Sequence, residues 1–197
     1  MTLKQIERIK SKIDKLKKEL AKDKKMWGGQ HHDGRGIRYL LTKEYLKLKD
    51  YKSGLKYLKW FDKYFPDDIG YPMFLFESAV ILYKNEKLKE AEEKVHRTFY
   101  ANTFLLDRFL EKETLQLPKS EGSNWELESL VDKFPYHKME PELVEFANWV
   151  DSILNTKSFL DKANEFIDIK QKLITEPVGE KRTKLIKRLY TIQYGEF

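Results

Sequence analysis

Two eleven-residue segments of this chain, 45–55 and 82–92, follow the same pattern of residue types. Each reads as the end of a helix, a polar turn, a Tyr or Leu, two polar residues and then a small residue. The small residues are Gly54 and Ala91, and they lie 37 positions apart. Two antiparallel helices pack closely only where a small residue lets the backbones approach, so the repeat predicts stacked helical hairpins.

The rest of the sequence also predicts helices. Apolar residues recur at three- and four-residue spacing, Gly and Pro are few, and the alternation typical of strands is missing from the sequence. We therefore expect an all-α protein, a superhelix of antiparallel hairpins with further helices at both ends. The expected helices are 3–25, 38–48, 51–65, 72–85, 87–100, 103–111, 125–134, 141–154, 158–174 and 181–194.

Three segments are expected along the chain. Residues 1–27 predict a basic, coiled-coil-like helix, residues 33–112 the helical repeats, and residues 123–197 C-terminal helices packed on the same domain. The Gly-rich residues 28–36 mark a loop, and residues 113–124 read as an irregular connection.

The repeats resemble tetratricopeptide units, which have a period of about 34 residues. The resemblance is specific over residues 35–68, where Leu58 and Phe61 would face a partner helix and Pro66 ends the unit. It is weaker over residues 72–103, which lack the closing Pro.

A second resemblance is to a group of uncharacterised bacterial tetratricopeptide-like proteins. It is carried by Asp33 to Leu41 (Asp-Gly-Arg-Gly-Ile-Arg-Tyr-Leu-Leu), by Ala101 to Phe104 (Ala-Asn-Thr-Phe) and by Trp149. Those proteins have an Asp-Asn-x-Gly-x-Arg-Tyr-Leu-Leu segment, so Gly34 replaces an Asn here. The resemblance implies a fold and no reaction.

Charge and cysteine content exclude several classes of function. The chain has no Cys, so disulfides, thiolate metal sites and Cys nucleophiles are excluded. Residues 1–25 hold ten basic and four acidic side chains, which equals the whole net charge of +6. The neutral remainder is a poor candidate for wrapping nucleic acid. With neither a long apolar run nor a leader-like N-terminus, we expect a cytoplasmic protein without membrane contact.

The N-terminal helix carries a narrow apolar stripe with the spacing of a short coiled coil. One interpretation is packing on its own domain, and the other is self-association into a homodimer. The residues of the stripe are Ile6, Ile9, Ile13, Leu16 and Leu20.

The tetratricopeptide resemblance implies a concave groove lined by the first helix of each hairpin. Aromatic and Met side chains with Lys at the rim suit an acidic-apolar peptide. It is equally possible that the C-terminal helices cover this groove. The expected lining is Tyr39, Lys43, Leu46, Lys47, Met73, Phe76, Val80 and Tyr83.

The loop offers weaker candidates for chemistry. His31, His32 and Asp33 could suggest a metal, but a solvated loop in which Asp33 caps the next helix explains them better. The loop glycines lack the Gly-Lys-Ser/Thr sequence of a phosphate cradle. Arg38 is expected to form an ion pair or to bind a loop carbonyl. We expect no catalytic residue, metal or cofactor.

The leading hypothesis is a non-enzymatic helical-repeat scaffold that binds a protein or peptide partner. The alternative is binding of nucleic acid or another anionic surface through both basic termini. At the C-terminus the basic residues are Lys181, Arg182, Lys184, Lys187 and Arg188.

Overall fold

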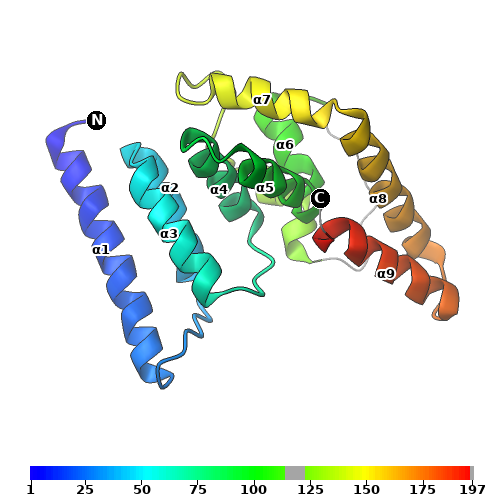
Figure 1. Ribbon diagram of the computed structural model, residues 1–197, viewed down its shortest axis with the longest axis horizontal. Coiled ribbons are helices and arrows are strands. Elements are labelled where there is room, and N and C mark those ends of the chain that lie inside the picture. Colours follow the sequence, from blue (N-terminus) through cyan, green and yellow to red (C-terminus); the bar gives the residue numbers. More distant parts are fainter. Residues whose placement is uncertain (114–122, 196–197) are drawn as a thin grey trace. The chain divides into compact units, whose positions relative to one another are not determined.

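The computed structural model describes residues 1–113 and 123–195, and over these residues the chain is helical without a strand. The expected all-α class is therefore confirmed for the part of the chain described. The residues divide into two compact units, Met1–Ala91 and Glu92–Phe197. The boundary falls inside helix α5 (Figure 1).

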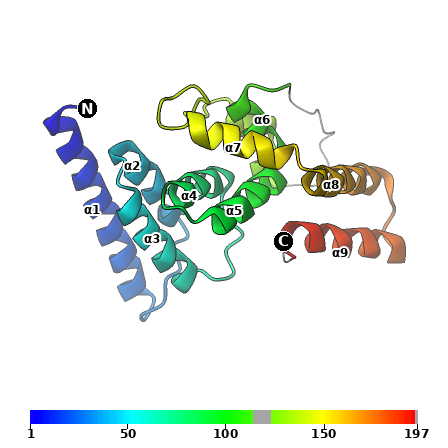
Figure 2. The same cartoon turned by 45° about the horizontal axis from the view of Figure 1, so that its top comes forward.

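In unit 1, α1 packs on α2, and α2 and α3 both pack on α4 as well as on each other. Figures 1 and 2 show α1, α2 and α3 as neighbouring rods in both views. A single 3₁₀ turn, η1, precedes α2. The elements are α1 (Leu3–Met26), η1 (Ile37–Tyr39), α2 (Leu41–Leu48), α3 (Tyr51–Tyr64), α4 (Pro72–Lys84) and the first turn of α5 (Leu88–Ala101).

Local sequence signals set the ends of these helices. Thr2 caps α1 in a reciprocal capping box with Gln5. The carboxylate of Asp50 accepts a hydrogen bond from the backbone N–H of Ser53 and so caps α3. Pro72 occupies the first turn of α4, where its missing N–H costs nothing.

Gly54 of α3 lies against the side chain of Ile81 of α4. A Cβ at this position would lie 3.0 Å from Cδ1 of Ile81, and Gly54 is buried. Ala91, the equivalent residue of the second segment, is also completely buried. The small residue at Gly54 therefore makes room for the side chain of Ile81 on α4.

Unit 2 is built from the rest of α5 and the helices that follow it. α6 packs on η3 and α7, α7 packs on α8, and α8 and α9 form a hairpin. Its core includes Tyr100, Phe166, Ile169, Leu173 and Ile192. The elements are α6 (Thr103–Leu110), η2 (Asn124–Glu126), η3 (Glu128–Val131), α7 (Val144–Leu154), α8 (Lys157–Thr175) and α9 (Glu180–Tyr194).

The helix expected at 125–134 was wrong. Two 3₁₀ turns stand there, separated by Leu127 in an extended conformation. The buried side-chain amide of Asn102 donates hydrogen bonds to the carbonyl oxygens of Trp125 and Leu127, so these carbonyls have partners outside a helix. A tertiary contact thus replaces the helical hydrogen bonds that the local sequence predicted.

Two other helices begin later than expected, and part of one expected segment lies outside the described residues. The helix expected from Pro141 begins at Val144 after a turn, and the one expected from Arg38 begins at Leu41 after η1. The expected irregular connection, 113–124, falls mostly on the residues that are not described.

Within residues 1–113 and 123–195, none of the helices combines the length and apolar composition that crossing a bilayer requires.

Candidate functional site

Unit 1 contains a cavity of about 420 Å³ between three of its helices. This volume is within the range of about 300–1,000 Å³ that is typical of ligand pockets. α1, α2 and α3 contribute most of the lining, and the loop after α1 contributes His31. The lining residues are Lys17, Leu20, Ala21, Lys24, His31, Tyr45, Ser53, Lys56, Tyr57 and Trp60.

One wall of the cavity is a series of aromatic rings. The rings of Tyr45 and Tyr57 have centroids 6.1 Å apart, and Tyr57 stacks on Trp60 at 5.4 Å with an interplanar angle of 23°. Trp60 in turn meets the ring of His31 nearly edge to face, at 5.1 Å and 85°. Side chains of this kind give a ligand a large, rigid contact area at little cost in side-chain entropy.

Three lysines give the cavity a positive charge. Nζ of Lys17 lies 5.7 Å from the ring centroid of Tyr45, and Nζ of Lys24 lies 4.7 Å from that of Tyr64. Lys56 comes from α3. Neither an Asp nor a Glu is among the described lining residues, and none of the three lysines forms an ion pair with a described residue. The cavity therefore favours an anion.

His31 is enclosed by aromatic rings at the edge of the cavity. Besides Trp60, its ring contacts those of Tyr64 and Phe65. Nδ1 is buried and has no hydrogen-bond partner among the residues described. Burial and the charge of Lys24 lower the pKa of His31. Both effects favour the neutral imidazole.

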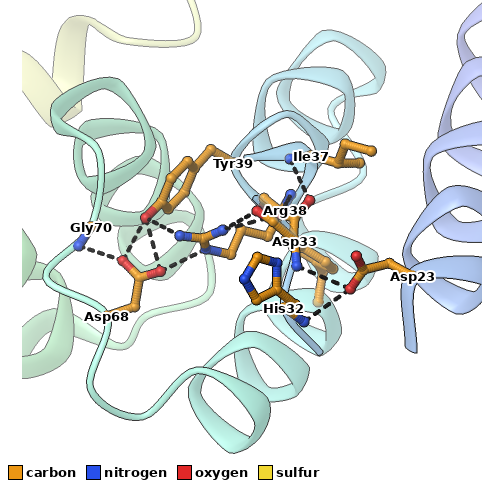
Figure 3. Close-up of polar contacts among 9 residues, drawn as sticks. Asp23, His32, Asp33, Ile37, Arg38, Tyr39, Asp68 and Gly70 are labelled. Atoms are coloured by element: carbon orange, nitrogen blue, oxygen red, sulfur yellow. Dashed lines mark hydrogen bonds and ion pairs between the residues drawn. The ribbon is translucent and has the colours of Figure 1, made fainter. Parts of the chain in front are cut away.

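Asp23 fixes the loop that carries His31 to the end of α1. Its Oδ2 accepts hydrogen bonds from the backbone N–H groups of His32 (2.9 Å) and Asp33 (3.0 Å), as Figure 3 shows. The hydrogen bond from Asp33 is the main reason why the pKa of Asp23 is lowered. His32 is not a lining residue of the cavity and stacks on Trp27, with ring centroids 4.5 Å apart.

A polar network centred on Arg38 connects the same loop to the segment before α4 (Figure 3). The carboxylate of Asp33 accepts hydrogen bonds from the N–H groups of Ile37 (3.0 Å) and Arg38 (2.8 Å), so it caps the turn η1 and not the helix α2 that was expected. The guanidinium donates to the carbonyl oxygen of Asp33 at 2.8 Å and to Asp68 at 2.6 Å. Asp68 also accepts from the hydroxyl of Tyr39 and from the N–H of Gly70.

Arg38 therefore has both of its expected roles, as an ion-pair partner and as a donor to a loop carbonyl. The planar guanidinium holds two loops at once, a geometry that Lys does not reproduce. Burial and the hydrogen bond to Asp68 raise the pKa of the Tyr39 hydroxyl, so it stays protonated and acts as a donor.

Tyr57 joins the aromatic wall to this network. Its hydroxyl donates a hydrogen bond to the carbonyl oxygen of Arg38. Burial raises the pKa of Tyr57, which keeps the hydroxyl proton in place. The ring of Tyr57, in the middle of the aromatic wall, is thus held in place through its hydroxyl.

A buried carboxylate ties α1 to α2 close to the cavity. Glu44 is nearly inaccessible to solvent, and it accepts hydrogen bonds from Lys12 (2.7 Å) and Lys47 (3.1 Å). Burial would raise the pKa of Glu44, but the two lysines outweigh burial and lower it. Lys12 comes from α1, so this pair stabilises the helix packing that shapes the cavity.

The residues of the expected groove do not form one surface. Phe76 and Val80 are each only 1% exposed, because α4 is apolar on nearly all sides and most of it belongs to the core. Including these two residues as accessible groove residues was therefore wrong. Lys47 is engaged with Glu44, and Tyr39 with Asp68. Lys43 is exposed, and Leu46, Met73 and Tyr83 are half-buried.

Part of the apolar stripe of α1 that was expected to mediate self-association is buried inside unit 1. Ile13 and Leu20 are 5% and 3% exposed, and their helix packs on α2. Ile6, Ile9 and Leu16 are half-buried. These burials favour the first interpretation, a helix packed on its own domain.

The other candidates from the sequence do not assemble into a site. Among the residues described, no three His, Cys, Asp or Glu side chains are close enough to hold a metal ion. Of the C-terminal basic residues, Lys181, Lys184 and Arg188 form ion pairs, with Glu176, Glu180 and Glu165. Arg182 donates to backbone carbonyls.

The sequence interpretation missed most of the cavity. A signal was present, since Tyr57, Trp60 and Tyr64 follow helical spacing on one face of α3. Lys17 and Lys24 lie seven residues apart on α1, beside its apolar stripe. Nothing in the sequence states that these two faces meet.

Comparison of this chain with family models, with curated proteins and with solved structures finds no match.

Proposed function

We propose that this protein is a non-enzymatic interaction module and that unit 1 binds an acidic segment of a protein partner at the cavity between α1, α2 and α3. The single observation that carries the proposal is the lining of this cavity, an aromatic wall beside three lysines without a described carboxylate. We also propose that the hairpins belong to a tetratricopeptide-like stack, for which the close approach at Gly54 is the support.

The chemistry of the lining argues for an anchored peptide. Trp, Tyr and Lys stem atoms provide apolar contact, as interface hot spots usually do. The ammonium groups of Lys17, Lys24 and Lys56 can pair with carboxylates that flank an apolar or aromatic anchor. Lys17 and Lys56 are exposed and Lys24 is half-buried, so these ammonium groups add affinity and steering at little desolvation cost.

A nucleic acid would use different features. Its phosphates would need a continuous surface of free basic groups, and the binding affinity would depend steeply on salt concentration. Most of the C-terminal candidates are paired with acids, which leaves α1 as the main basic surface. This distribution favours the acidic peptide, and a gel shift with single- and double-stranded oligonucleotides provides the comparison.

The test uses the full chain and a synthetic probe peptide in which one Trp is flanked on both sides by Glu. Binding is measured by isothermal calorimetry. Replacement of Lys24 or Lys56 by Gln is expected to weaken binding about fivefold each, as a contribution of ~1 kcal/mol per charge pair implies. The matched controls are Lys18→Gln and Lys59→Gln, which are on the same two helices but outside the lining.

Weakening in the first pair of variants and not in the second supports the proposal. Equal weakening in all four variants indicates attraction to net charge alone. Failure of the acidic probe to bind, together with a salt-sensitive oligonucleotide shift, replaces the proposal by nucleic-acid binding.

A further inference from the structure

His31 is the one described lining residue of the cavity whose ordinary pKa lies near neutrality. The other ionisable lining residues are lysines and tyrosines, which keep their protons at neutral pH. A change of protonation on ligand binding would therefore fall on this imidazole.

The surroundings of His31 are aromatic, and burial among these rings favours the neutral imidazole in the free chain. Trp60, Tyr64 and Phe65 enclose the imidazole, with ring centroids between 5.0 and 5.6 Å from it. Aromatic rings of this kind attract cations through the negative charge of their faces. Nδ1 has no described partner that would require the neutral form.

Burial is the largest cause of the lowered pKa of His31, and charged groups of the neighbouring elements modify it. Lys24 of α1 opposes a charge on His31, while Asp23 of α1 and Asp33 of the loop favour one. From α3, Lys56 lines the same cavity, and Nζ of Lys63 lies 5.4 Å from the ring centroid of Tyr64. A bound carboxylate would pair with the ammonium of Lys24 and so cancel its repulsion of a charge on His31.

We infer that His31 binds the anionic ligand of the cavity in its protonated form, so that occupation of the cavity is coupled to the uptake of a proton by this side chain. The inference rests on the proposed function and adds a specific ligand-binding residue to it. On binding, the negative carboxylate of the ligand and the positive imidazolium would stabilise each other. Affinity for the anion must then rise as the pH falls through the range in which the free His31 is neutral.

The experiment uses the full chain and the same Glu-flanked Trp peptide. Calorimetry at about pH 7 in two buffers that differ in ionisation enthalpy measures the protons taken up on binding. We expect an uptake of up to about one proton, and a Kd that falls about three- to tenfold between about pH 8 and about pH 6. Nuclear magnetic resonance of the His ring protons is expected to show a higher pKa for His31 in the complex than in the free chain.

His31→Phe keeps the aromatic packing and removes the titration, and His31→Gln keeps a polar side chain. Both variants are expected to bind without proton uptake and with a flat pH profile. His32→Gln is the matched control, because His32 is the adjacent His and stacks on Trp27 outside the cavity lining. It is expected to retain the uptake.

The outcomes separate this inference from the proposed function. Binding without proton uptake by the unmodified chain, or the same uptake in His31→Phe, overturns the inference and leaves peptide binding in place. Absence of peptide binding at every pH overturns the proposed function, and the inference fails with it.

Discussion

The hydroxyl of Tyr57 donates a hydrogen bond to the carbonyl oxygen of Arg38. This contact connects a side chain in the wall of the cavity with the backbone of the residue that holds two loops together. The position of the aromatic wall therefore depends on the polar network behind it, although the network does not line the cavity.

Removing that hydroxyl tests the connection. Tyr57→Phe leaves the carbonyl of Arg38 without this donor in a largely buried place, so we expect a loss of about 1–2 kcal/mol in the free energy of unfolding. Urea denaturation followed by Trp fluorescence measures it. Tyr64→Phe, on the same helix, is the control and is expected to change stability by less than ~0.5 kcal/mol. A loss as large in Tyr64→Phe would show that the hydroxyl of Tyr57 has no special role.

Arg38→Lys tests the forked geometry of the network. Lys keeps the charge but cannot reach Asp33 and Asp68 together, so we expect a loss of about 1–3 kcal/mol. Hydrogen exchange of the Gly70 and Ile37 amides is expected to accelerate, because both donate to the carboxylates that Arg38 binds. Unchanged exchange at both amides would contradict the network's role in fixing the loops.

Gly54→Ala tests the close approach of α3 to α4. The new Cβ would meet Cδ1 of Ile81 at 3.0 Å, and we expect a loss of about 1–3 kcal/mol from overpacking. Ile81→Val removes the atom in closest contact, so the double variant is expected to be more stable than the sum of the single changes predicts. A double-mutant cycle from denaturation curves gives the coupling. If the losses of stability in the two single variants simply add up in the double variant, the structure accommodates the new Cβ without strain against Ile81.

Unit 2 contains a pH-dependent element at His96, whose ring packs on Phe159 at a centroid distance of 5.3 Å. Burial, with a contribution from Lys162, lowers the pKa of His96 to about 4. The unfolded chain then binds the proton more tightly than the folded one. The contribution of His96 to the free energy of unfolding is therefore complete above about pH 6.5 and is lost as the pH falls toward 4.

The loss is expected to reach about 2–3 kcal/mol at pH 4, and His96→Phe should remove this part of the pH dependence. Denaturation midpoints measured across this range check the prediction. The same dependence in the variant would assign it to other groups.

The hairpin of α8 and α9 contains both a capping contact and a surface ion pair, so their contributions to stability can be compared. Arg182 donates to the carbonyl oxygens of Leu173 (2.7 Å) and Glu176 (2.8 Å) at the end of α8, while Arg188 pairs with Glu165 on the surface. We expect Arg182→Ala to cost about 1–2 kcal/mol and Arg188→Gln to change stability much less, because its ion pair is exposed to solvent. Thermal unfolding at low and high salt distinguishes them, because only the exposed pair is screened.

Much of the fold could be predicted from the sequence because its signals are local. Apolar spacing predicted ten helices, and nine of them are present among the described residues. Asp33 was predicted as a cap because its side chain needs only the next few N–H groups. The helix expected at 125–134 failed because Asn102, more than twenty residues earlier, binds the carbonyls of Trp125 and Leu127.

The sequence by itself determined the helical class, the small residue at Gly54 and the polar anchor at Arg38, since each follows from spacing or from the chemistry of one side chain. Only the tertiary structure decided that Lys24, His31 and Trp60 line one cavity and that Phe76 belongs to the core. The reason is physical: periodicity defines a face on each helix, but which faces meet depends on packing between segments distant in the chain.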